Sequence, residues 1–143
     1  MTANIDAIKR LTEEFLNQGQ GDVLKALYSA DAIHHTPLGD LDVKGRQDTR
    51  MALGMAIPDF KVTVTSLTAN EDWVSALYQF SGNFTGALPM PDGTVVPGNK
   101  AAINMPLGTF YRMNAHSQVI ESWELYDNLN FSMMMGLLSA PAN

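Results

Sequence analysis

The chain has 143 residues, of which 45% are hydrophobic, and this predicts one globular domain over residues 1–143. The net charge of −6 and the scattered basic residues argue against nucleic acid or an anionic membrane as a partner. The absence of cysteine excludes disulfides, thiolate nucleophiles and Cys-based zinc sites. The chain begins MTANIDAIKR, without an apolar signal core, and contains no run of transmembrane length, so we expect a cytoplasmic protein.

The first part of the chain has the pattern of helices. Apolar residues recur at helical spacing over residues 4–18, which predicts an amphipathic helix. Asp22 can cap a short second helix. Residues 46–57 form a third helix, which Pro58 ends, and residues 37–45 before it are expected to be a loop.

Residues 31–36 (DAIHHT) are expected to form a short strand. Neighbouring strand residues point to opposite faces, so at most one of His34 and His35 faces a core. Together with Asp31 they do not have the spacing of a metal site, and no further ligand follows, so we expect no metal.

After residue 60 the pattern changes to alternation with a period of two, which is typical of strands. Pro106 suggests a bulge or a free edge in the third run, and the turn residues of segment 86–100 predict an exposed excursion. Three N-terminal helices followed by an antiparallel sheet make an α+β domain. A sheet covered on one face curls, and its concave side can enclose a small-molecule cavity. The alternating runs are residues 60–65, 73–84, 101–113 and 118–127.

The last run places a carboxylate beside apolar groups. Trp123, Leu125 and Asp127 share one side of the expected strand. Desolvation there would raise the pKa of Asp127 and suit it to acid/base catalysis near neutral pH. The alternative is that Asp127 only ends the strand and starts a turn with Asn128.

An apolar cluster follows at the C-terminal end, with Phe131 and Met134 in it. It either closes the core or makes a dimer contact, or it is an adaptable lid over a flat hydrophobic ligand, since methionine packs against irregular shapes. The open outer face of such a sheet suits a second subunit, so we expect a homodimer or a higher homo-oligomer. No phosphate loop or dinucleotide motif is present, which argues against a nucleotide cofactor.

Several short motifs in order make residues 26–136 similar to the SnoaL-like polyketide cyclase family, which has the cone-shaped NTF2-like fold. The order and spacing of the motifs are specific for the fold and less so for the activity. The matching pieces are Tyr28-x-x-Asp31-x-x-x-His35-x-Pro37, Gly45-Arg46, Pro58-Asp59-Phe60, Glu71-Asp72-Trp73-Val74, Gly82-x-x-x-Gly86, the insert PDGTVVPGNK, Arg112, and Ile120-Glu121-x-Trp123-x-x-x-Asp127-x-Leu129.

The resemblance implies a curved, mostly antiparallel sheet and an enzyme that needs no metal or cofactor. Members of the family close a ring of an aromatic polyketide by intramolecular aldol condensation. Asp127 matches their acid/base aspartate, and His35 matches a histidine that assists it. The resemblance implies that both point into the cone, where we expect cavity walls from Trp123, Phe84, Tyr111, Asn104, Met134 and Phe131.

The sequence also departs from the family. Phe84 stands where the family often has a pocket histidine, and Met134 lies in a segment where the family has Gln-Leu-Gly. These changes make the expected pocket more apolar. Two hypotheses therefore stay open: a cofactor-independent acid/base enzyme acting on a hydrophobic carbonyl-bearing molecule by aldol cyclisation, isomerisation or dehydration, and a non-catalytic hydrophobic-ligand-binding or dimerisation module.

Alternation alone does not fix which polar strand residues face the cavity. Tyr111 is a candidate donor, and Asn104 a candidate inward-facing amide. Each could equally belong to a wall or to the surface, because a cone buries much of both sheet faces. Arg112 and Glu121 are expected to form a cross-strand ion pair.

Overall fold

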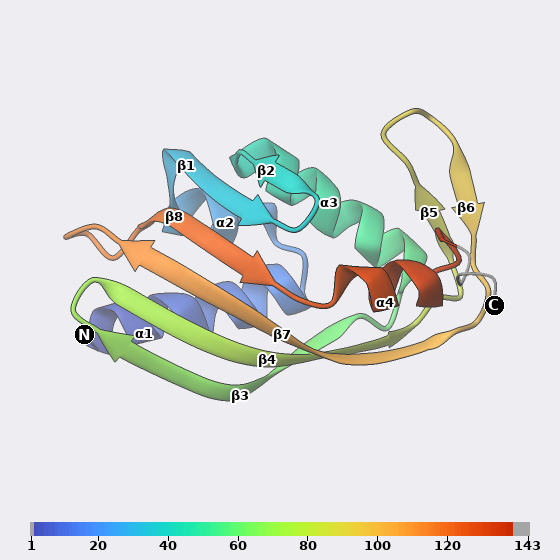
Figure 1. Cartoon of the computed structure of the whole chain (residues 1–143). Helices are drawn as coiled ribbons and strands as arrows, with labels where there is room; N and C mark the ends of the chain where they lie inside the picture. Colours follow the sequence, from blue (N-terminus) through green and yellow to red (C-terminus); the bar gives the residue numbers. More distant parts are fainter. Residues whose placement is uncertain (1, 139–143) are drawn as a thin grey trace.

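The computed structural model describes residues 2–138 and shows helices covering one face of a curved sheet (Figure 1). This α+β architecture confirms the predicted fold class. The helical segments are α1 (Thr2–Arg10), the π-helical η1 (Leu11–Asn17), α2 (Gly21–Leu27), α3 (Val43–Ala56) and α4 (Asn128–Met134). The strands are β1 (Tyr28–Thr36), β2 (Gly39–Leu41), β3 (Lys61–Asn70), β4 (Trp73–Asn83), β5 (Ala87–Pro89), β6 (Val95–Pro97), β7 (Ala102–Met113) and β8 (Val119–Leu125).

The main sheet has the strand order β2-β1-β8-β7-β4-β3, and all of its pairs are antiparallel except β1 with β8. The mostly antiparallel sheet is therefore confirmed. Pro106 pairs with Gln79 on β4, whereas the pairing of β7 with β8 extends only as far as Gly108 opposite Leu125. Pro106 thus lies at a free edge, where a missing N–H costs no ladder hydrogen bond.

Short side-chain contacts fasten the helices to the sheet. The Asn17 side chain at the end of η1 accepts from the Val62 N–H (2.8 Å) and donates to the Val62 carbonyl (3.0 Å). Arg50 of α3 donates from Nε to the Leu16 carbonyl at 2.7 Å. Gly86 meets the end of α3 so closely that an added Cβ would lie 1.9 Å from the Met55 carbonyl oxygen. The helices are therefore held at fixed depth over the concave face.

Three local elements differ from the sequence-based expectation. Segment 37–45 was expected to be a loop, but it contains β2 and the start of α3, which Asp42 caps by accepting from the Gly45 N–H at 2.7 Å. Segment 86–100 was expected to be an exposed excursion, and most of it is exposed, but it also carries the β5–β6 hairpin, which Leu88 packs against the core. The last strand ends at Leu125 rather than continuing to Asp127, because the chain there turns into α4.

In the part of the chain that the structure describes, no helix is both long enough and apolar enough to cross a membrane.

Candidate functional site

Strand β8 sends alternate side chains to the two faces of the sheet. Ser122 is fully buried and pairs with the fully buried Tyr111, so Ser122 and, two residues on, Glu124 point inward. Trp123 and Leu125 lie on the outer face, where Leu125 is 59% exposed. Trp123 and Leu125 therefore mark the outside of the cone at this end of the strand, and Ser122 and Glu124 its interior.

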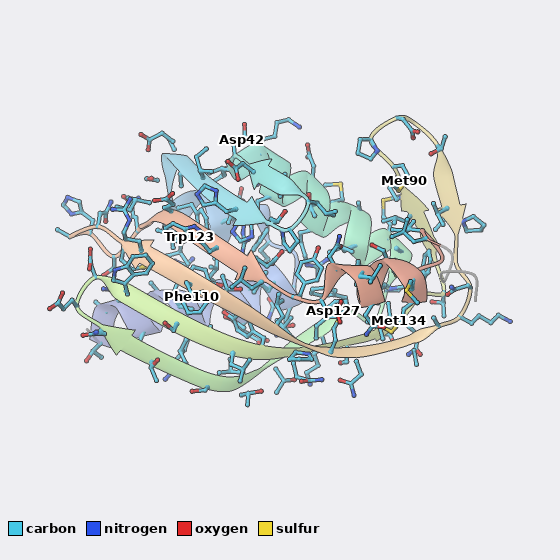
Figure 2. The ribbon with its side chains drawn as sticks, viewed as in Figure 1. Asp42, Met90, Phe110, Trp123, Asp127 and Met134 are labelled. Carbon is cyan, nitrogen blue, oxygen red and sulfur yellow. The ribbon has the colours of Figure 1, made fainter. Side chains whose placement is uncertain are left out.

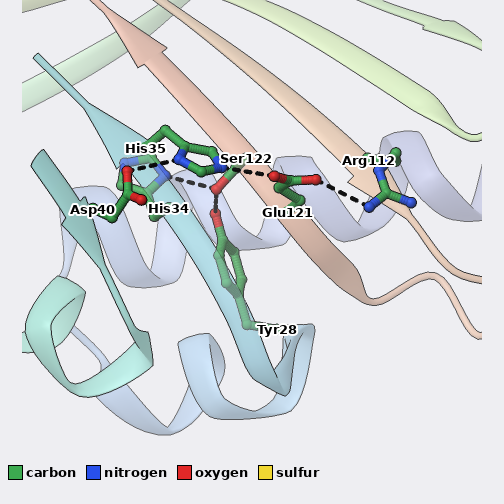
Figure 3. A network of polar contacts seen from close by, with 7 residues as sticks. All are labelled: Tyr28, His34, His35, Asp40, Arg112, Glu121 and Ser122. Carbon is green, nitrogen blue, oxygen red and sulfur yellow. Dashed lines mark hydrogen bonds and ion pairs between the residues drawn. The ribbon is translucent and has the colours of Figure 1, made fainter.

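Five side chains form a polar group in that interior, which we call the interior cluster. His34 Nδ1 lies 2.6 Å from Ser122 Oγ, and Ser122 Oγ lies 2.8 Å from the Tyr28 hydroxyl (Figure 3). Arg46 donates from its guanidinium to His34 Nε2. Since Nε2 accepts, the ring proton sits on Nδ1 and is donated to Ser122. The members are Tyr28, His34, Arg46, Ser122 and Glu124.

Glu124 is the acidic member of the cluster, and its carboxylate contacts the imidazole of His34. Its Oε1 lies 3.6 Å from His34 Nε2, and its side chain is 23% exposed. Burial raises the pKa of Glu124, but the His34 contact and the charge of Arg46 outweigh burial, and the net pKa is lowered. Burial, and then the charge of Arg46, lower the pKa of His34 to about 4. At neutral pH the cluster thus holds an ionised carboxylate, a neutral imidazole and a guanidinium.

Arg46 is buried at the start of α3, with only 5% of its surface exposed. Its Cζ lies 5.7 Å from the ring centroid of Phe15 and 5.3 Å from that of Tyr28, so both rings stabilise the cation. Burial lowers the pKa of Arg46, but the surrounding tyrosines and Glu124 more than offset this, and the pKa is raised. Its Nε–H is buried and has no hydrogen-bond partner among the residues that the structure describes.

A second buried polar group continues from the cluster along the same face. The Tyr78 hydroxyl lies 2.8 Å from Thr12 Oγ1 and 3.1 Å from the Tyr111 hydroxyl. Burial raises the pKa of Tyr78 and places that of Tyr111 well above its usual value, so both phenols stay protonated. Tyr111, expected to be a pocket donor, is therefore an interior residue.

His35 does not enter the cone as expected, because it lies on the outer face of the sheet. Its two ring nitrogens contact Asp40 and Glu121, each at 2.7 Å, and these contacts raise its pKa (Figure 3). Its ring stacks on Trp123 with 5.2 Å between centroids. The predicted ion pair of Arg112 with Glu121 is confirmed, at 3.0 Å.

Asp127 is exposed, so the expectation of a carboxylate among apolar groups is wrong. It lies at the start of α4 (Figure 2), where its Oδ1 accepts from the Asn130 N–H at 3.0 Å. It makes no hydrogen bond or ion pair with His35 in the described chain, so the two are not a hydrogen-bonded pair. The alternative, that Asp127 ends the strand and starts a turn, is nearer to its geometry, although β8 already ends at Leu125 and Asp127 caps α4.

The other predicted wall residues divide between the two faces. Phe84 is fully buried in the core, and Phe131 is half-buried, with its ring 6.0 Å from that of Phe80. Met134 is half-buried on α4. Asn104 is exposed and accepts from Gln79 at 2.6 Å, so its placement in the cavity is wrong. Trp123 on the outer face is likewise not a cavity wall.

Two surface hollows, of about 250 and 540 Å³, lie outside the interior cluster. The first lies between α1, η1 and β3, and the second lies beside Met113 and Ser117; neither is lined by a member of the cluster. Among residues 2–138, no three His, Cys, Asp or Glu side chains gather closely enough to hold a metal ion. The chemistry that the described residues offer is proton transfer and charge stabilisation.

Comparison with known sequences decides the family. Residues 6–132 match the sequence profile of the SnoaL-like polyketide cyclases. The chain belongs to the SnoaL-like polyketide cyclase family. Membership supports a cyclase-type role for this SnoaL-like protein. No curated protein sequence matches it.

Solved structures agree on the fold. A candidate SnoaL-like polyketide cyclase from Jannaschia sp. CCS1 is 21% identical with a TM-score of 0.78, over 99% of this chain and 94% of that one. IdmH, a candidate polyketide cyclase from Streptomyces antibioticus, is 22% identical with a TM-score of 0.74, over 93% and 98%. AclR, a candidate hydroxylase from Streptomyces galilaeus, is 16% identical with a TM-score of 0.78, over 100% and 87%.

Sequence reasoning missed most of the interior cluster of this SnoaL-like protein. The rule that only one of His34 and His35 faces the core was right, but the resemblance favoured His35. Glu124 could have been found by alternation from Ser122, had the apolar side of β8 not been assigned to the interior. Arg46 carried no local signal beyond its place in a Gly-Arg pair, because only the fold brings α3 over β1.

Proposed function

We propose that this SnoaL-like protein is a cofactor-independent acid/base enzyme acting on a hydrophobic, carbonyl-bearing small molecule. The observation that carries the proposal is the group of Glu124, His34 and Arg46 inside the fold, where a carboxylate and a guanidinium both contact Nε2 of a neutral imidazole. Membership of a cyclase family supports the same class of chemistry. The reaction we propose is an intramolecular aldol cyclisation or a related isomerisation or dehydration.

Glu124 is the proposed base. Its lowered pKa keeps the carboxylate ionised at neutral pH. It takes a proton from the carbon beside a carbonyl, and the electrons of the C–H bond move to the carbonyl oxygen as an enolate. Arg46 offsets the low basicity of Glu124 by stabilising that oxygen, since a fixed cation is worth more in a dry site than in water.

The remaining steps return the proton, so no oxidant or reductant is needed. The enolate carbon attacks a second carbonyl of the same molecule and forms the new C–C bond. The second carbonyl oxygen becomes an alkoxide and takes the proton that Glu124 received. His34 is the proposed positioning residue, because its Nδ1–H is fixed by Ser122 and its Nε2 by Arg46. Such a second contact holds the ring in one tautomer and orientation.

The proposal requires a ligand to displace side chains, because large residues such as Tyr78 and Tyr111 are fully buried in the interior. Helix α4 is the proposed cover. Phe131 of this helix packs on Phe80 and on Tyr126, with 5.8 Å between the Tyr126 and Phe131 rings. The backbone of α4 is tied to the rest of the molecule by a hydrogen bond from Asn99 Nδ2 to the Met134 carbonyl at 2.9 Å. A short helix with methionines suits an adaptable cover.

The test is proton exchange at a carbonyl compound in D₂O. The protein is incubated with 2-tetralone, and deuterium uptake beside the carbonyl is followed by NMR. We expect Glu124→Gln to lower the catalysed rate at least about 100-fold, the low end of what general base catalysis contributes. The resemblance instead predicts that Asp127→Asn abolishes it. A variant pair in which Glu124→Gln keeps the rate and Asp127→Asn loses it would overturn the assignment of Glu124.

A second candidate function is non-catalytic binding of a hydrophobic ligand. It is favoured by one observation: neither surface hollow is lined by Glu124, His34 or Arg46. It predicts ligand uptake without chemical change. Recovery of a deuterated or cyclised compound after incubation would exclude it.

We also propose that the outer face of the sheet pairs with a second copy of the chain. An exposed aromatic patch lies there, in which Trp73 and Trp123 have 5.3 Å between ring centroids and Phe110 is 40% exposed. Charged residues border the patch, among them Arg112 and Glu121. An aromatic centre with a polar border is typical of protein interfaces. Figure 2 shows Phe110 and Trp123 on neighbouring strands of this face.

A further inference from the structure

Arg46 carries a buried positive charge that no described carboxylate neutralises directly. Its side chain is 5% exposed, and no carboxylate of residues 2–138 lies within ion-pair distance of its guanidinium. Glu124, the acidic member of the interior cluster, contacts His34 instead. A buried charge without a counter-ion is costly, and so is a buried N–H without an acceptor. Arg46 meets both conditions, since its charge lacks a described counter-ion and its Nε–H lacks a described acceptor.

The neighbours of Arg46 compensate the charge only in part. His34 Nε2 accepts from the guanidinium, and the rings of Phe15 and Tyr28 lie against the cation. These groups offer ring faces and one neutral acceptor, and none supplies a negative charge. The unused Nε–H therefore fits an acceptor that arrives with a ligand, and a planar guanidinium binds an oxyanion through paired N–H groups.

The other end of the same interior is apolar. Phe80 on β4 lies two residues beyond Tyr78 on the same inward face, and its ring contacts those of Phe60, at 4.9 Å, and Phe131. Tyr126 lies two residues after Glu124 and contacts Phe131. The interior is thus polar and cationic at one end and aromatic at the other. A molecule with the same polarity would match both ends.

We propose that the ligand is an aromatic molecule bearing a carboxylate, which Arg46 binds through its unpartnered Nε–H. This inference rests on the proposed function for the location of the ligand and adds the chemical class of the group that is recognised. It gives Arg46 a role in binding that does not depend on proton transfer by Glu124. The two proposals therefore fail in different experiments.

The probe is 2-naphthoate, with 2-naphthamide as its neutral match in shape, and binding is measured by isothermal titration calorimetry. We expect naphthoate to bind wild-type protein about tenfold or more tightly than naphthamide, the ratio that a hydrogen bond to a charged group provides. Arg46→Met should remove the difference. Arg46→Lys keeps the charge without the Nε–H and should retain only part of it. Lys44→Met removes an exposed cation from the same helix, paired with Asp48, and should change nothing.

Glu124→Gln separates this inference from the proposed reaction. Removing that negative charge should strengthen naphthoate binding while proton exchange is lost. Equal binding of naphthoate and naphthamide, absence of naphthoate binding, or a preference that survives in Arg46→Met would overturn the recognition of an anion by Arg46. Proton exchange that survives in Glu124→Gln overturns the proposed reaction and leaves the binding result intact.

Discussion

His34 should make the protein sensitive to mild acid. Its pKa in the fold is about 4, because burial and the charge of Arg46 disfavour the imidazolium, whereas an unfolded histidine titrates near 6.5. Between these values the unfolded chain binds a proton that the folded chain does not, so the stability of the fold decreases as the pH falls. Below pH 6.5 one such group lowers the unfolding free energy by about 1.4 kcal/mol per pH unit, so the loss between pH 7 and pH 5 is about 2 kcal/mol.

The assay is urea unfolding at pH 7 and pH 5 for the wild type and for His34→Gln, which offers an acceptor to Arg46 and a donor to Ser122. We expect the wild type to lose about 2 kcal/mol more than the variant over this range. Glu124 does not obscure the result, because its lowered pKa confines its loss of stabilisation to pH values below about 4.5. Equal losses in the two proteins, or an NMR titration of His34 near 6.5, would refute the reasoning.

His35 supplies a control of opposite sign. Its pKa is raised by Glu121 first and then by Asp40, so its stabilisation is fully present below pH 6.5 and is lost as the pH rises through the folded pKa. In the wild type it partly offsets the loss at His34. His35→Gln should therefore make the loss between pH 7 and pH 5 larger, whereas His34→Gln makes it smaller.

Two further predictions concern the outer face and the tyrosine pair. In sedimentation velocity, Trp123→Ser should weaken self-association about 30-fold or more, as expected for a central aromatic interface residue. The control is Val95→Ser, which changes an exposed apolar residue on the β5–β6 hairpin and should leave self-association unchanged. A wild type that sediments as a monomer would contradict the proposed pairing of two sheets. Tyr111→Phe should lower the unfolding free energy by only about 1 kcal/mol, because the Tyr78 hydroxyl keeps its hydrogen bond with Thr12. A loss above about 3 kcal/mol would mean that the Tyr111 hydroxyl has a role beyond its hydrogen bond with Tyr78.

The sequence was sufficient for the fold because its local patterns agree with one another. Alternation from residue 60 onward, helical spacing before it and Pro58 between them specify an α+β order that the tertiary structure does not override. Pro106 also limited its position to a bulge or a free edge, and the structure has the free edge.

The candidate site was less predictable because it depends on which side of a strand is inside. Trp123 and Leu125 alternate with Ser122 and Glu124, and hydrophobicity favoured the first pair as the buried one. The fold reverses this: Ser122 and Glu124 face the interior, and Trp123 and Leu125 face out. Hydrophobicity misleads here because the outer face itself carries apolar side chains, with Trp123 in contact with the rings of His35 and Trp73. The choice of His35 over His34 came instead from the family resemblance, since alternation alone only required that one of the two face the core.

Asp127 caps helix α4 instead of lying in the interior, and a pair of substitutions can separate this structural role from catalysis. As the N-cap of α4 it satisfies the Asn130 N–H, and asparagine caps a helix about as well as aspartate, whereas alanine does not. We expect Asp127→Ala to lower the unfolding free energy by about 1 kcal/mol and Asp127→Asn to leave it nearly unchanged.

We expect activity to depend on whether residue 127 can cap α4, and not on whether it carries a charge. If α4 covers the interior, Asp127→Ala loosens the cover and changes the apparent affinity for 2-tetralone, while Asp127→Asn behaves as the wild type in both the deuterium-exchange assay and urea unfolding. A proton-transferring Asp127 would give the opposite result: both variants would lose exchange equally, because neither asparagine nor alanine can carry the proton. Loss of exchange in Asp127→Asn at unchanged stability would therefore return the acid/base role from Glu124 to Asp127.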